Sequence, residues 1–135
     1  MLGMLDRFKG WAPLFLRLVI GIIFISHGSD KVFGGMEKFT DTVAGLGIPP
    51  FLAYVSVGTE LLGGILLVLG LLARWAALFI VINMAMAILK VHLPYGLRGA
   101  QGFEFPLILL VGALALVLWG AGPLSLDRSV LKREF

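Results

Sequence analysis

Hydrophobic and polar positions divide the chain into four long apolar segments. An α-helix rises about 1.5 Å per residue, so about 20 apolar residues cross the roughly 30 Å of hydrocarbon in a bilayer. Lipid offers no partner for free backbone groups, and a segment that is not part of a closed barrel must therefore be helical. The pattern predicts one all-α domain over residues 1–135, an integral membrane four-helix transmembrane bundle. Its predicted spans are residues 13–32, 51–72, 75–93 and 103–119.

Turn residues mark the breaks between these spans. Gly34-Gly35 ends the first span, and Pro49-Pro50 precedes the second. Only Ala73-Arg74 separates the second span from the third, which predicts a tight antiparallel pair. The longest loop contains a stretch, residues 36–46, that is expected to form a short interfacial helix. The polar tail, residues 125–135, is expected at the surface.

Composition supports a membrane protein and narrows its chemistry. The chain is 59% hydrophobic and 14% charged, whereas a soluble domain carries about a quarter charged residues. Basic residues gather at segment ends without interleaved aromatic residues, so we expect a lipid bilayer and no nucleic acid as partner. Cysteine is absent, which excludes a disulfide, a thiolate metal site and a thiol relay within this chain.

Basic residues also predict the orientation. Seven of them fall on the side that holds both chain ends and four on the other, which places both termini in the cytoplasm and the protein in the cytoplasmic (inner) membrane. The first apolar run is too long for a cleaved signal peptide and contains a charge, so it is interpreted as a span. The seven are Arg7, Lys9, Arg17, Arg74, Arg128, Lys132 and Arg133; the four are Lys31, Lys38, Lys90 and Arg98.

Ionisable side chains within the spans are the main functional signal, because each is costly in lipid. The helical rise places most of them in the outer half of the bundle, with Arg17 nearer the cytoplasmic side. The eight are Arg17, His27, Asp30, Lys31, Glu60, Lys90, His92 and Glu104.

Glu60 is the strongest functional signal of the eight, because it lies in the middle of an apolar run. A buried carboxylate is either neutral or paired, here with Arg17, His27 or Lys90. Lys90 and His92 are about 200° apart on a regular helix and cannot both face inward unless the helix loosens before Pro94. We expect His92 to point inward and Lys90 to snorkel towards the interface.

Purely structural roles are open for several of these residues. Lys31 and Lys90 suit interfacial anchors, and Glu104 can complement a helix dipole. Arg17 can stabilise the inner ends of the helices. Small residues at Thr59/Gly63 and Ala73/Ala77 are typical of close helix packing.

Six short motifs, in their order and spacing, resemble the DoxX family of small bacterial and archaeal membrane proteins. The resemblance implies a four-helix bundle in the cytoplasmic membrane. DoxX relatives include a membrane subunit of thiosulfate:quinone oxidoreductase and members linked to oxidative-stress complexes; unlike the thiosulfate enzyme, this chain has no obvious second domain. The motifs are His27-Gly28-x-x-Lys31, Glu60-Leu-Leu-Gly63-Gly64, Arg74, His92-Leu-Pro94-x-Gly96, Gly102-Phe-Glu104 and Gly122-Pro-x-Ser-Leu-Asp127.

The leading hypothesis is a membrane subunit of a redox system that binds quinone in a polar pocket and acts with a partner protein. A carboxylate and a histidine can hydrogen-bond the quinone oxygens and pass protons, which assigns catalytic roles to Glu60, His27 and His92. No metal site is predicted, and whether the chain is itself an enzyme is left open. The predicted cofactor-binding residues are Lys31, Lys90, Glu104 and Arg17, and the predicted apolar walls are Phe24, Met84 and Trp119.

Two other hypotheses stay open. The chain could be a non-enzymatic anchor or assembly module, whose polar residues hold helices together in a homo-oligomer or hetero-complex. It could also be a small-solute carrier or a haem or metal protein with His27 and His92 as ligands.

Overall fold

Five α-helices form the described part of the chain, residues 2–133 and 135, in the computed structural model. No strand occurs among these residues, so the all-α prediction is confirmed. A 3₁₀ helix, Leu2–Trp11, leads into the first α-helix. The helices are α1 (Ala12–Asp30), α2 (Met36–Gly45), α3 (Phe51–Leu69), α4 (Ala73–Ala87) and α5 (Glu104–Trp119).

The four predicted spans correspond to α1, α3, α4 and α5, and each helix begins within two residues of the predicted start. α1 and α3 each have 19 residues, and helical turns after α4 extend that run to Tyr95. These three runs are long and apolar enough to cross a membrane, and α5 is a shorter apolar helix of 16 residues. The membrane-bundle prediction is therefore confirmed, and α2 matches the predicted short helix.

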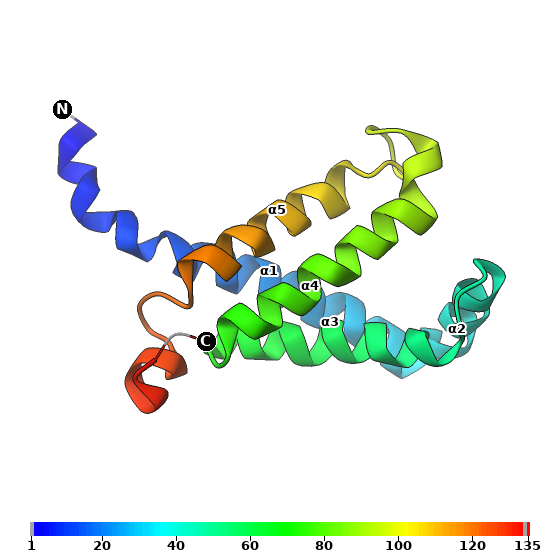
Figure 1. Cartoon of the computed structure of the whole chain (residues 1–135), viewed down its shortest axis with the longest axis horizontal. Coiled ribbons are helices and arrows are strands. Elements are labelled where there is room, and N and C mark those ends of the chain that lie inside the picture. The colour runs from blue at the N-terminus through cyan, green and yellow to red at the C-terminus, as the bar shows by residue number, and fades with distance from the viewer. Residues whose placement is uncertain (1, 134) are drawn as a thin grey trace.

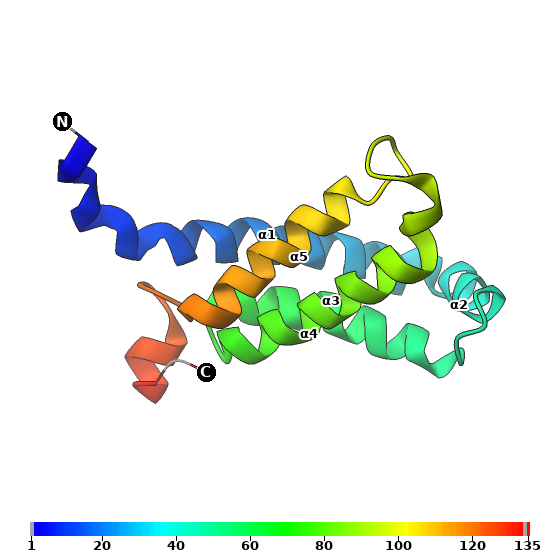
Figure 2. The same cartoon turned by 45° about the horizontal axis from the view of Figure 1, so that its top comes forward.

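The bundle is closed at one end and splayed at the other. α1 packs on α3, α4 packs on α5, and α3 contacts α4. Residues 70–72 connect α3 to α4, and we call this turn the hinge. Figure 1 shows α3 and α4 together at the hinge and well separated at their other ends, on the side where α2 lies. Figure 2 shows the same separation after rotation. The N-terminal 3₁₀ helix and the C-terminal segment both lie at the hinge end.

Glycines let α1 and α3 touch backbone to backbone. A Cβ added to Gly21 would lie 2.8 Å from the carbonyl oxygen of Gly64, and one added to Gly28 would lie 2.8 Å from the amide nitrogen of Leu61. Side chains at these positions would push the helices apart, as expected where small residues drive association in lipid. Gly63, on another face of α3, packs against Ile80 of α4.

The hinge end is tied by the C-terminal segment, of which residues 128–133 are exposed, as expected of a surface tail, whereas Ser125 and Asp127 are buried. Asp127 is fully buried, and its carboxylate accepts hydrogen bonds from the amides of Leu72 at 2.7 Å and Ala73 at 3.0 Å. These amides begin α4, so Asp127 caps that helix from a distant part of the chain. Arg17, also fully buried, donates to the carbonyls of Ala121 at 2.6 Å and Leu124 at 2.8 Å.

Candidate functional site

A cavity of about 830 Å³ occupies the splayed half of the bundle, between α3 and α4. Its walls come from α1, α2, α3, α4, α5 and the turns after α4, and most lining side chains are apolar. Six of the seven predicted site residues line it, whereas Arg17 lies at the hinge end, about 14 residues or 21 Å along the helix from Lys31. The six are His27, Lys31, Glu60, Lys90, His92 and Glu104.

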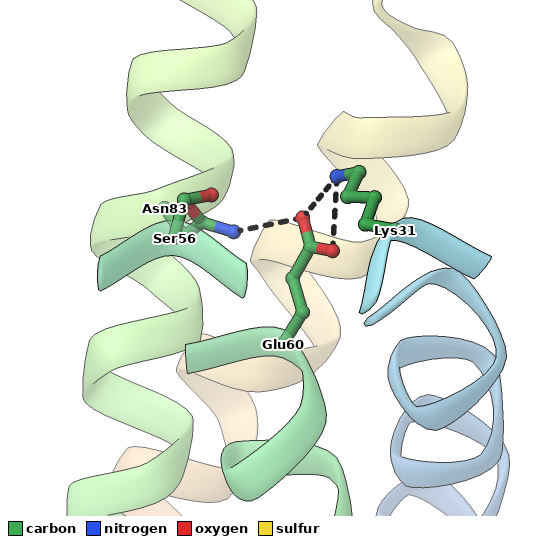
Figure 3. Close-up of polar contacts among 4 residues, drawn as sticks. All are labelled: Lys31, Ser56, Glu60 and Asn83. Carbon is green, nitrogen blue, oxygen red and sulfur yellow. Dashed lines mark hydrogen bonds and ion pairs between the residues drawn. The ribbon is translucent and has the colours of Figure 1, made fainter. Parts of the chain in front are cut away.

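A charged hydrogen-bond network forms the polar wall of this cavity (Figure 3). The Lys31 ammonium donates to both carboxylate oxygens of Glu60, at 2.8 and 2.9 Å. The Asn83 amide donates to Glu60 Oε1 at 3.4 Å, and the Ser56 hydroxyl donates to Asn83 Oδ1 at 2.7 Å. We call Lys31, Ser56, Glu60 and Asn83 the polar network. It joins the end of α1 to α3 and α4, and Glu60 is only 5% exposed.

Helix geometry explains how these groups meet. Ser56 and Glu60 are four residues apart, so they lie on one face of α3, and α4 presents Asn83 to the same face. Lys31 begins a π-helical turn, Lys31–Gly35, at which α1 passes into α2. α2 folds back so that the ring of Phe39 lies 4.1 Å from the Lys31 nitrogen. This cation–π contact holds the ammonium on its second side.

The partner of Glu60 differs from the prediction. Arg17, His27 and Lys90 were the expected partners, and the structure pairs Glu60 with Lys31 instead. Arg17 faces the hinge end, where it donates to backbone carbonyls. Lys31 shares a helix face with His27 and stands one turn further along, which brings its long side chain to the height of Glu60.

The two histidines lie at the edge of the cavity rather than on Glu60. The His27 ring is largely exposed, and its centroid is 6.3 Å from that of Phe105. His92 is half-buried, and its Nδ1 lies 2.8 Å from the carbonyl oxygen of Gln101. Both rings border the cavity: His27 one helical turn before Lys31 on α1, and His92 in the turn after α4.

The helix does loosen before Pro94, which was the condition for Lys90 and His92 to lie on one side of it. α4 passes into a π-helical turn, Ile88–His92, immediately before Pro94. A π turn holds more residues than an α turn, so it rotates the facing of the residues after it. His92 lines the cavity as expected; Lys90 lines it as well, although its side chain is exposed.

Three residues that contribute to the site were not predicted from the sequence. Ser56 and Asn83 complete the polar network, and Phe39 covers Lys31. Asn83 is the only asparagine in the chain and lies within an apolar span, a signal that could have identified it. Of the expected apolar walls, Phe24 and Met84 line the cavity and Trp119 does not.

The charges around the cavity balance. Two lysines, Lys31 and Lys90, and two carboxylates, Glu60 and Glu104, line it, so these four groups sum to zero formal charge. An apolar cavity with a few convergent polar groups is the usual form of a small-molecule site. This one suits a neutral ligand with a polar head and an apolar body.

Apolar helices around a buried polar network and cavity define the class, a small helical membrane protein with an intramembrane polar site. The chain belongs to the DoxX family, whose match covers residues 12–93. It is 38% identical over 119 residues to "Putative oxidoreductase CatD" of Bacillus subtilis, covering 88% of this chain and 87% of that protein.

Other relatives are named as membrane proteins. An uncharacterized membrane protein of Mycobacterium tuberculosis is 34% identical, covering 87% of this chain and 80% of the relative. Inner membrane protein YqjF of Escherichia coli is 27% identical, covering 89% and 92%. These names agree with a chain whose apolar helices contact the lipid bilayer. No solved structure matches the chain.

Proposed function

We propose that the cavity binds the head group of a lipid-soluble quinone and that the chain is the membrane subunit of a quinone-linked redox system. The observation that carries this proposal is the buried polar network on the wall of an otherwise apolar cavity. The name of the Bacillus subtilis relative, a putative oxidoreductase, supports the redox class. A partner protein would supply the electrons in this scheme.

The residues present fit a quinone in size, polarity and charge. A quinone ring carries hydrogen-bond acceptors on an apolar frame, and a bound quinone would supply electron-coupled proton chemistry. Lys31 is placed to donate a hydrogen bond to a carbonyl oxygen while Glu60 holds its charge. Glu60, His27 and His92 line the same cavity and are the groups that could exchange protons with a bound quinone.

Charge balance favours a quinone over an anionic lipid. Glu60 is paired with Lys31, and the cavity lining holds as many carboxylates as lysines, so it offers no surplus formal positive charge to a phosphate. A neutral head group that needs only one or two hydrogen bonds has a smaller free-energy cost of desolvation at this wall than a phosphate would have. Arg17, a predicted cofactor contact, has no part in this proposal, because its guanidinium bonds the C-terminal segment.

Glu60→Gln tests the proposal directly. We expect wild-type protein in lipid nanodiscs to bind menaquinone or ubiquinone, and the amide to weaken binding by about tenfold, which is 1.4 kcal/mol. The cause is loss of the charge that positions Lys31. Quinone titration and native mass spectrometry of protein purified with its own lipid provide the measurement.

Glu37→Gln is the matched control, because Glu37 is exposed on α2 and does not line the cavity. Its quinone affinity should equal that of the wild type. The proposal fails if no quinone is retained after purification and none binds on titration.

The polar network also favours one alternative, a non-enzymatic assembly module. Because it joins α1, α3 and α4, its first role would then be to hold the bundle in a shape that partner proteins recognise. In that case Glu60→Gln lowers thermal stability and partner recovery together, with no quinone effect at any stage.

A further inference from the structure

The cavity opens sideways between α3 and α4. Six large apolar side chains both line the cavity and are 36–55% exposed: Phe105 on α5 and a set of five on α3 and α4, which marks where the cavity mainly meets its surroundings. Within a membrane those surroundings are acyl chains. We call this set the α3–α4 opening: Leu52 and Val55 on α3, with Phe79, Ile82 and Met86 on α4.

The outer end of the cavity is covered by two elements. α2 lies across it, with Phe39 over Lys31 and Val43 buried. The loop over residues 96–103 covers the other side, where its residues line the cavity. The His92 ring contacts the carbonyl of Gln101, and backbone hydrogen bonds close the loop on itself. Gly102 is required there, since a Cβ would lie 2.5 Å from a carbonyl oxygen.

The opening leads straight to the polar network. Val55 immediately precedes Ser56, and Ile82 immediately precedes Asn83. The Ser56–Asn83 hydrogen bond, 2.7 Å long, bridges α3 and α4 at the inner side of the opening. A molecule entering from the bilayer would therefore meet apolar side chains first and hydrogen-bonding groups next.

We infer that the ligand is a long-tailed quinone that enters from the bilayer and whose isoprenoid tail leaves through the α3–α4 opening. This inference rests on the proposed quinone site and adds the route by which the ligand enters and its tail leaves. The head group then lies at Lys31 and Glu60, and the tail remains among acyl chains. Acyl chains are as apolar as the opening, so the tail gains little affinity there and needs only an unobstructed path.

Obstructing that path should affect tailed ligands alone. Val55→Trp and Ile82→Trp add bulk at half-exposed positions on two different helices, so neither overfills the core. Each should weaken binding of a long-tailed menaquinone by at least about tenfold and change binding of a tail-free naphthoquinone by less than about twofold. Affinities are measured in nanodiscs, with each ligand expressed per mole of lipid.

Ile108→Trp is the matched control. Ile108 is 64% exposed on α5 and does not line the cavity. This variant should bind both ligands like the wild type. Thermal denaturation of all three variants identifies any that misfold.

A measurement on the unaltered protein gives a second test. A menaquinone analogue with a photoreactive group in its tail should crosslink to α3 and α4 and leave α5 unmodified. Crosslinking confined to α5, or a phospholipid retained in the cavity in place of quinone, would overturn the inferred route.

The outcomes separate the two proposals. If the wild type binds both ligands and neither tryptophan discriminates between them, the tail route is wrong and the quinone site stands. Equal loss of both ligands in a stable variant also rejects the route, because the added bulk then acts on the head-group site. If the wild type binds neither ligand, both proposals fall.

Discussion

At the residue scale, the pairing of Glu60 with Lys31 explains how a carboxylate survives within an apolar span. The carboxylate receives two hydrogen bonds from Lys31 and a longer one from Asn83. Removing Lys31 from this partly buried pair leaves the buried Glu60 charge without compensation, which costs more than the pair itself contributes. The lysine is held in turn by Phe39, so the site depends on both partners.

Lys31→Met tests this dependence. We expect a loss of about 1–3 kcal/mol in the free energy of unfolding, because Glu60 keeps only its contact with Asn83. The double variant Lys31→Met/Glu60→Gln should recover part of that loss. Unfolding in mixed micelles provides the measurement, with Lys38→Met on the exposed face of α2 as control. A double variant as unstable as the sum of the single variants would contradict the coupling.

At the element scale, glycine contacts and π turns set how the helices meet. Gly21, Gly28 and Gly64 bring α1 against α3, which places the end of α1 beside Glu60. Lys31 continues the face of α1 that carries His27, and the π turn after α4 rotates His92 towards the cavity. Changing one glycine contact should therefore disturb the site from a distance.

Gly64→Ala and Gly58→Ala form a matched pair on α3. The new Cβ at Gly64 would lie 2.7 Å from the Gly21 carbonyl oxygen, whereas the one at Gly58 would meet nothing within 4 Å. We expect Gly64→Ala to cost about 1–3 kcal/mol of stability and Gly58→Ala to be neutral or stabilising. Unfolding in mixed micelles measures the stability of both variants. Equal effects of the two substitutions would show that the contact between Gly64 and Gly21 is not tight.

At the scale of the whole molecule, the two ends of the bundle differ: contacts of the C-terminal segment hold the hinge end together, and the splayed end contains the candidate site. Arg17 and Asp127 fasten the C-terminal segment to the hinge end, where α3 and α4 meet. The opposite ends separate (Figure 1), and the side chains between them line the cavity. We propose that the tied end faces the cytoplasm, since basic residues are more numerous there.

Single cysteines test this orientation, because the chain contains none of its own. Ala44→Cys places a thiol on exposed α2 at the splayed end, and Val130→Cys places one on the exposed C-terminal segment. A membrane-impermeant maleimide should label the first in intact cells and the second only after permeabilisation. The opposite labelling pattern would invert the orientation.

The sequence by itself determined the helices, their number and the height of the titratable groups. Hydrocarbon forces apolar spans to be helical, and a constant rise per residue places His27, Glu60 and His92 in one half of the bundle. Which groups touch was decided only by the tertiary structure. Contact depends on the rotation of each helix and its approach to the next; here glycine contacts bring α1 against α3 so that Lys31 reaches Glu60, and the C-terminal segment supplies the carbonyls that Arg17 bonds.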